Sequence, residues 1–171
     1  AMAKNFIRAY ALEDCRPASV LSRANRALYL QAESPDFISL IYGLLDRERG
    51  VFAYANAGHP WPMVLASRGD NVRISSGVNL PLGIEPGERY REHFLKFKAG
   101  DRLVLYTDGV AEIRRRGRVW GEDGLQRALL KYGKLSCNEL SARILNEMIE
   151  YSGGRLADDI ILLILRWIPR R

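Results

Sequence analysis

Acidic residues next to apolar runs are the side chains of this sequence whose types and spacing are best suited to chemistry. The segment Gly100–Glu112 reads G-D-R-L-V-L-Y-T-D-G-V-A-E, and it brings Asp108 to the end of a strand-forming run. Near the other end of the sequence, Asp158 and Asp159 directly precede a second apolar run, Ile160–Leu165. The two acidic strand ends can therefore meet, and a carboxylate in that position is where a metal ligand is expected.

Hard divalent cations are the metals that such carboxylates would hold. Mg²⁺ and Mn²⁺ take six oxygen ligands, usually a few carboxylates together with several waters. Two such ions roughly 3.5 to 4 Å apart can activate a bridging water and neutralise phosphoryl oxygens. Acids at strand ends beside glycines are therefore the residue type that hydrolysis of a phosphate ester requires.

The elements that must position these acids are predicted to be strands in the middle of the chain and helices towards both ends. The run Leu103–Tyr106 is apolar on both faces, which predicts a central, buried strand, and Ile160–Leu165 is a second candidate for a buried strand. Antiparallel strands are expected at residues 37–45, 51–57, 63–66, 72–74 and 90–97, and helices at residues 1–12, from Pro17, after Gly121 and after Ser136.

The helix after Ser136 carries the clearest start and stop signals. Ser136 and Glu139 have the spacing of a capping box, and the pair Gly153-Gly154 is expected to end the helix. Helices at both ends of a strand-rich middle indicate an α+β layered domain.

Length and composition indicate one domain over residues 1–171, because 171 residues with 47% hydrophobic content suffice for a single core. No apolar run approaches the roughly 18 residues of a membrane span, and the N-terminus lacks the order of a signal peptide, so no membrane association and a cytoplasmic location are expected. Cys15 and Cys137 have no metal-ligand spacing and are interpreted as reduced structural thiols.

The charge of the chain is moderately basic, at +6, and four arginines follow the Asp108 strand closely: Arg114, Arg115, Arg116 and Arg118. Nucleic-acid binding would require basic residues interleaved with exposed aromatics or a groove-binding motif, and neither is present, so it is not expected. The arginines are either a solvated loop or a site that attracts a phosphorylated partner.

Six segments in order also carry a family resemblance. The chain resembles the SpoIIE-type, RsbU-like branch of the PPM metal-dependent protein serine/threonine phosphatases along essentially its whole length. The segments are F-I-S-L-I-Y-G-L-L-D at 37–46, Y-A-N-A-G-H-P at 54–60, L-P-L-G-I at 80–84, Y-T-D-G-V at 106–110, W-G-E-D-G-L at 120–125 and D-D-I at 158–160.

The resemblance implies the PPM β-sandwich flanked by helices, in α-β-β-α layers, and a two-metal site for Mn²⁺ or Mg²⁺. Asp108 and Asp158 match the family's metal ligands in these motifs. Asp159 is either a further ligand or a cap for a neighbouring loop, because Ile161 stands where the family often has threonine. The implied substrate is a phosphoprotein such as an anti-sigma-factor antagonist in bacterial stress signalling.

One part of the family pattern is missing from this sequence. The family's N-terminal Gly-Asp and Asp-x-x-Gly-His-Gly motifs supply further metal-binding acids, and no Gly-His-Gly occurs here. The chain is therefore expected to be a C-terminal portion of the family domain and inactive alone. A non-catalytic, phosphatase-like module that binds a partner protein is the alternative. An open sheet edge left by absent strands would favour a symmetric or swapped homodimer.

The remaining polar candidates are interpreted mainly as structural. His59 has a side chain that titrates near neutral pH and suits proton donation, but its place between Gly58 and Pro60 favours a turn. Asn56 is interpreted as a turn former, His93 as an edge position without a functional role, and Leu80–Ile84 as a rigid loop that borders the site or fixes the chain direction.

Overall fold

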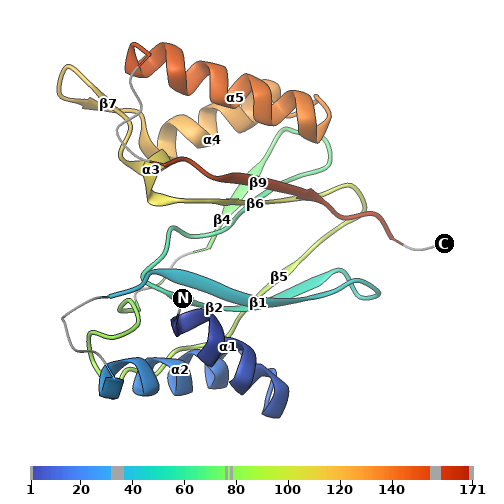
Figure 1. The fold of residues 1–171 in the computed structure, drawn as a ribbon. Coiled ribbons are helices and arrows are strands. Elements are labelled where there is room, and N and C mark those ends of the chain that lie inside the picture. Colours follow the sequence, from blue (N-terminus) through green and yellow to red (C-terminus); the bar gives the residue numbers. More distant parts are fainter. Residues whose placement is uncertain (1, 32–36, 76, 78, 155–158, 170–171) are drawn as a thin grey trace. The chain divides into compact units, whose positions relative to one another are not determined.

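The protein is described here by a computed structural model, which covers residues 2–31, 37–75, 77, 79–154 and 159–169. The chain divides into two compact units (Figure 1). Unit 1 comprises residues 1–59 and 77–96, and unit 2 comprises residues 60–76 and 97–171. The single domain expected over residues 1–171 stays a prediction.

Unit 1 consists of two helices and a three-stranded antiparallel sheet of order β1-β2-β5. Its elements are α1 (Met2–Glu13), α2 (Pro17–Gln31), β1 (Leu40–Asp46), β2 (Val51–Ala57) and β5 (His93–Lys96). Strands β1 and β2 pair as an antiparallel hairpin, and in its turn Asp46 Oδ1 accepts hydrogen bonds from the backbone N–H groups of Glu48 and Arg49 at 3.0 and 2.9 Å. Gly50 completes the turn with a φ of 62°.

Helices α1 and α2 lie on one face of the sheet of unit 1 (Figure 1), and residues from the helices and the sheet form its buried cluster. Helix α2 begins at Pro17, as predicted, since proline has no N–H to lose at a first helical position. The buried apolar side chains of this core are Ala3, Leu21, Leu28, Ala55, Ala57, Leu82 and Tyr90.

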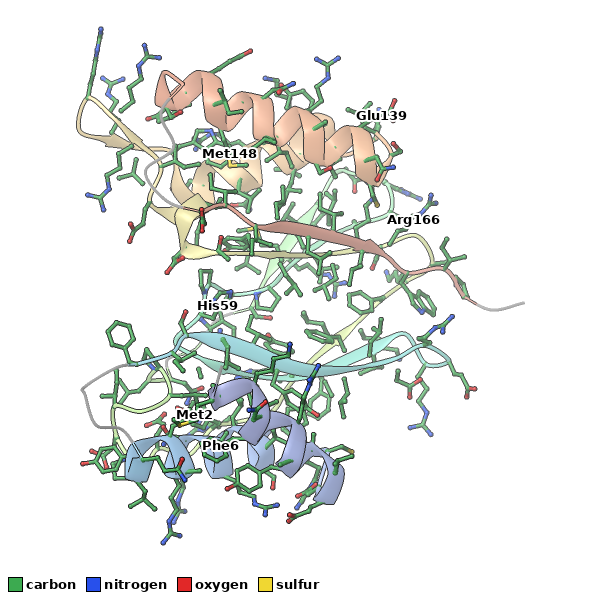
Figure 2. The ribbon with its side chains drawn as sticks, viewed as in Figure 1. Met2, Phe6, His59, Glu139, Met148 and Arg166 are labelled. Atoms are coloured by element: carbon green, nitrogen blue, oxygen red, sulfur yellow. The ribbon has the colours of Figure 1, made fainter. Side chains whose placement is uncertain are left out.

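Unit 2 contains a four-stranded antiparallel sheet of order β4-β3-β6-β9, covered on one face by helices α4 and α5 (Figure 1). Its elements are β3 (Met63–Leu65), β4 (Val72–Ile74), β6 (Arg102–Tyr106), α3 (Asp108–Ala111), β7 (Arg114–Arg115), β8 (Arg118–Val119), α4 (Gly121–Tyr132), α5 (Cys137–Ser152) and β9 (Leu162–Arg166). Figure 2 shows Met148 pointing from α5 into the buried cluster that also contains Met63, Val104 and Leu129.

The predicted capping of α5 is confirmed. Ser136 Oγ accepts a hydrogen bond from the Glu139 N–H at 3.3 Å, and Glu139 Oε2 accepts one from the Ser136 N–H at 3.1 Å. Gly153 ends the helix in the left-handed region, with a φ of 74°. The start and the end of α5 are therefore both set by local sequence.

Strand β6 is central, as predicted, because it lies between β3 and β9. The prediction that the last strand is buried is wrong. Among the described residues β9 pairs with β6 alone, and its side chains Leu163 and Leu165 remain 45% and 41% exposed. An apolar run thus indicated a strand correctly but could not show that the strand lies at an edge.

Two other strand boundaries differ from the prediction. The strand expected at residues 90–97 is only the four-residue β5, and it pairs with β2 instead of with the β6 strand that follows it in the chain. The strand expected from residue 37 begins at Leu40, while Ile38 forms an isolated bridge with Leu82. Cys15 and Cys137 are free thiols. None of the helices in the described ranges is both long and apolar enough to cross a bilayer.

Candidate functional site

Asp108 lies where the central strand of unit 2 turns into helix α3. The strand is fixed by Tyr106, which is buried and whose hydroxyl donates a hydrogen bond to Glu122 Oε1 at 2.8 Å. Burial, followed by the contact with Glu122, raises the pKa of the Tyr106 hydroxyl, so it remains a donor at neutral pH. Thr107 is extended, and Asp108 begins the helix with an exposed side chain.

The carboxylate of Asp108 is open to water. Its Oδ1 accepts a hydrogen bond from the N–H of Gly109 at 3.0 Å. Within the part of the chain that the structure describes, no lysine, arginine or histidine forms an ion pair with it. The second oxygen of this carboxylate is therefore available to an incoming ligand.

The end of β6 contacts the segment that leads into β9. The Thr107 N–H donates to the Ile161 carbonyl at 3.1 Å, and the Ile161 N–H donates to Thr107 Oγ1 at 3.0 Å. Thr107 Oγ1 also donates to the Asp159 carbonyl at 3.3 Å. At Gly109 an added Cβ would lie 2.5 Å from the Asp159 carbonyl oxygen, so only glycine permits this approach. The acidic ends of the two strands thus lie side by side, as the sequence suggested.

The oxygen atoms at this point belong to carboxylate and carbonyl groups, which are the ligand types that hard divalent cations prefer. Asp158, the second predicted ligand, lies outside the described residues. Within those residues, no group of three or more His, Cys, Asp or Glu side chains is gathered as a metal would require. Asp108 is the predicted ligand whose position the structure gives, and whether Asp159 is a ligand or a cap stays open.

The turn that contains His59 is held by its own side chains. Asn56 is 2% exposed, and its amide donates to the His59 carbonyl and accepts from the His59 N–H, both at 2.8 Å. Gly58 adopts a φ of 65°. The ring Nδ1 of His59 lies 3.2 Å from Ser39 Oγ. Asn56 is therefore a turn former, as predicted, and the backbone of His59 serves the turn.

The loop Leu80–Ile84 is anchored inside unit 1. Leu82 is fully buried and exchanges backbone hydrogen bonds with Ile38 at 3.0 and 2.9 Å. Asn25, on α2, accepts from the Gly83 N–H at 2.8 Å and donates to the Glu85 carbonyl at 2.7 Å. These contacts support the structural interpretation of this loop.

Each unit also has a hollow, and Asp108 is not among the described residues that line either of them. On unit 2, a hollow of about 460 Å³ is lined by Arg115, Arg116, Arg118 and Tyr151. The β7–β8 hairpin that forms it was not predicted from the sequence, in which Gly117 is the one residue typical of a turn between Arg114 and Val119.

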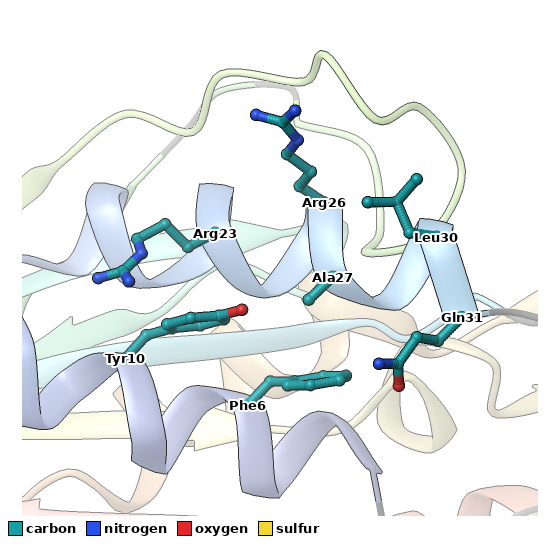
Figure 3. A pocket seen from close by; sticks show the side chains of 7 residues that line it. All are labelled: Phe6, Tyr10, Arg23, Arg26, Ala27, Leu30 and Gln31. Atoms are coloured by element: carbon teal, nitrogen blue, oxygen red, sulfur yellow. The ribbon is translucent and has the colours of Figure 1, made fainter.

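On unit 1, a hollow of about 430 Å³ lies along α1 and α2 (Figure 3). Tyr10 stacks on Phe6 with ring centroids 6.2 Å apart, and the Arg23 guanidinium lies 4.3 Å from the centre of the Tyr10 ring. The aromatic rings and the cation stabilise the contact between the two helices.

Comparisons with known proteins identify relatives of this arrangement. The family described as Stage II sporulation protein E (SpoIIE) matches residues 1–168. The chain is 28% identical over 151 residues to phosphoserine phosphatase RsbU of Bacillus subtilis, covering 88% of this chain and 45% of that protein. It is 29% identical over 140 residues to protein IcfG of Synechocystis, covering 80% of this chain and 22% of that protein. The chain thus spans less than half the length of these curated relatives.

Solved structures show the same fold. The PP2C domain of SiaA from Pseudomonas aeruginosa matches with a TM-score of 0.83 at 21% identity, over 96% of this chain and 67% of that chain. The RsbU and RsbW domains of Rv1364c from Mycobacterium tuberculosis match with a TM-score of 0.76 at 22% identity, over 99% of this chain and 47% of that chain. The α+β fold of PP2C-type phosphatase domains, expected from the sequence motifs, is therefore confirmed.

Proposed function

The chain belongs to the SpoIIE family, and from that membership we propose that it is part of the catalytic domain of a metal-dependent protein serine/threonine phosphatase. One observation carries the proposal. Asp108 follows the central strand β6 by two positions and has an open carboxylate, beside the segment that precedes β9 and carries Asp159. Family membership explains why an acid and a glycine occupy this position.

Asp108 and Asp158 are the proposed ligands of Mn²⁺ or Mg²⁺. When bound, a pair of such ions supplies an activated water and neutralises the phosphoryl oxygens of the substrate. The chain's own residues orient the ligand. Thr107 Oγ1 links the end of β6 to the β9 segment through Asp159 and Ile161, and Gly109 allows the two backbones to approach. Two carboxylates hold such an ion weakly, so the chain alone is expected to be inactive.

The proposed substrate is a phosphoserine or phosphothreonine on a bacterial signalling protein, such as an anti-sigma-factor antagonist. The relative RsbU, named a phosphoserine phosphatase, supports this substrate class. The proposed site of action is the cytoplasm. A homodimer is also proposed, because among the described strands β1 and β9 each have one side without a paired neighbour, and open edges favour association.

The test is hydrolysis of p-nitrophenyl phosphate with Mn²⁺ by this chain and by a version extended upstream by about 60 residues, if the gene encodes them, a length chosen from typical domain size. Activity in the extended version alone is the expected result. Activity in neither version would favour the alternative, a non-catalytic module that binds a partner protein. Activity in the short chain would show that fewer carboxylates suffice than proposed.

A further inference from the structure

The β7–β8 hairpin is a short, firmly anchored platform on unit 2. The two residues that flank it, Ile113 and Trp120, are buried, and the Trp120 N–H donates to the Ile113 carbonyl at 2.8 Å. Tyr151 of α5 donates from its hydroxyl to the Arg118 carbonyl at 3.3 Å. Figure 1 shows the hairpin beside the C-terminal end of α5. The base of the hairpin is thus fixed, while its tip extends into water.

No carboxylate in the described part of the chain neutralises the arginines of this hairpin. Arg114, Arg115, Arg116 and Arg118 are all exposed, and none forms an ion pair with a carboxylate of a described residue. Arg115 instead donates to the Glu150 backbone carbonyl at 3.4 Å. Four like charges within five residues repel one another. Binding of an anionic partner would lower this electrostatic repulsion and so stabilise the hairpin.

Arg116 occupies a position where a smaller, neutral residue such as asparagine or glycine would have less backbone strain. Its φ is 50°, and no other non-glycine residue in the described part of the chain has a positive φ. Gly117 follows with a φ of 77°. Two-residue hairpin turns of this kind favour Asn-Gly, because asparagine tolerates the left-handed region better than arginine. A strained residue that carries charge at an exposed turn indicates a function for that charge.

We propose that this arginine hairpin, defined as residues Arg114–Arg118 with Tyr151, docks an acidic segment of the phosphoprotein substrate. The identity of this occupant rests on the proposed function. The hollow of about 460 Å³ gives carboxylates access to the forked donors of three guanidinium groups, which bind them bidentately. Arg114 follows Asp108 by six positions, so the start of the hairpin lies within about 20 Å of the predicted metal ligand. A short peptide can span that distance.

The composition of the hollow favours a protein partner over a nucleic acid. Proteins that bind single strands combine a basic groove with successive aromatic rings on which bases stack. Here Tyr151 is the one aromatic residue among the described residues that line the hollow. The described residues of the site therefore offer charge and hydrogen bonds, which suit carboxylates, and a single aromatic ring in place of the successive rings of a strand-binding groove.

Binding is measured on the chain of residues 1–171 by fluorescence anisotropy in buffer with EDTA, where hydrolysis has no part. The probe is a labelled nonapeptide, Gly-Glu-Glu-Ala-phosphoSer-Ala-Glu-Glu-Gly. The triple variant Arg115→Glu/Arg116→Glu/Arg118→Glu is expected to raise its Kd at least about tenfold. The control Arg8→Glu/Arg68→Glu/Arg89→Glu changes the net charge equally at exposed residues outside the hairpin and is expected to leave the Kd within about twofold.

Three results would overturn the proposal: equal losses in the two triple variants, equal binding of a peptide with glutamine in place of glutamate, or much tighter binding of nine-residue oligothymidylate through the same arginines. Circular dichroism checks the fold of each variant, and Arg115→Gln/Arg118→Gln provides a milder change that is expected to weaken binding less. Because the assay reads no catalysis, its failure is distinct from failure of the proposed phosphatase activity.

Discussion

The His59 turn of unit 1 and the Asp108 turn of unit 2 both carry polar residues directly after a strand, yet they differ in how those residues are used. In the His59 turn, Asn56 is buried and both its amide groups bond the backbone of His59. In the Asp108 turn, the carboxylate is exposed, and within the described residues it accepts a hydrogen bond from the N–H of Gly109.

The difference teaches how structural and functional polar residues can be separated. A buried polar side chain must satisfy its hydrogen bonds inside the protein, so its role is to hold the fold. An exposed acid beside a closely packed glycine keeps carboxylate oxygens available to bind a metal ion or another ligand. Changes in the closed turn and its loop should therefore affect stability, and changes at the open end of β6 should affect activity.

The largest effect is expected from Asp108→Asn in the upstream-extended protein. Loss of one ligand charge should lower Mn²⁺-dependent hydrolysis of p-nitrophenyl phosphate at least about a hundredfold. The unfolding midpoint should stay unchanged, because asparagine can still accept from the Gly109 N–H. Asp123→Asn, an exposed position on α4, is the matched control. Retained activity in the Asp108 variant would refute the ligand assignment.

The next effect concerns Asn25, which holds the Leu80–Ile84 loop from inside unit 1. Asn25→Ala should lower the free energy of unfolding by about 2 to 4 kcal/mol, since it leaves the Gly83 N–H and the Glu85 carbonyl without this partner. Urea denaturation measures the change. Asn5→Ala, an exposed site on α1, should change stability by less than about 0.5 kcal/mol. Equal losses of unfolding free energy in the two variants would contradict the structural role of the buried Asn25.

A smaller effect of opposite sign is expected at the tip of the β7–β8 hairpin. Arg116→Gly removes the left-handed strain and should stabilise the protein by about 0.5 kcal/mol, after the entropy that glycine gains in the unfolded chain is subtracted. Arg118→Gly, in the extended strand β8, should destabilise it slightly. Thermal unfolding of the two variants provides the measurement, and stabilisation by both would exclude strain as the cause.

The smallest effect is a pH dependence at His93, whose ring packs against that of Tyr54 in unit 1 with centroids 5.4 Å apart and planes tilted by 33°. Burial, and then the charge of Arg91, lowers the pKa of His93 below its usual 6.5. Below pH 6.5 the unfolded chain therefore binds more protons than the folded one, so stability should fall as pH drops from 7 to 5. His93→Gln should flatten this dependence in urea titrations. An unchanged slope would remove His93 as its source.

Local signals in the sequence predicted much of the fold. Strand β2 occupies Val51–Ala57 and strand β4 occupies Val72–Ile74, as expected, because turn residues bound both runs. Helix α5 begins and ends where Ser136 and Gly153 indicate. What could not be predicted is which strands pair over long distances, since hydrophobic alternation is the same for any partner. The pairing of β5 with β2 is one such case.

The candidate site was predicted in part for the same reason. The position of Asp108 after a central strand follows from a local apolar run. The contact between Thr107 and Asp159 joins segments 52 residues apart in the chain and was only suggested by the matching acidic ends. The β7–β8 hairpin was missed because its strands have two residues each and its charge resembles that of a solvated loop.

The order of strands in the two sheets has a consequence for synthesis of the protein on the ribosome. The sheet of unit 1 has all its strands once Lys96 has been made, whereas the sheet of unit 2 needs β9, which ends at Arg166. Until β9 emerges, the apolar strand β6 has an unpaired edge, which is a template for pairing with other nascent chains. Unit 1 can therefore complete its sheet first, and unit 2 is the part of the chain with the longer need for chaperone protection.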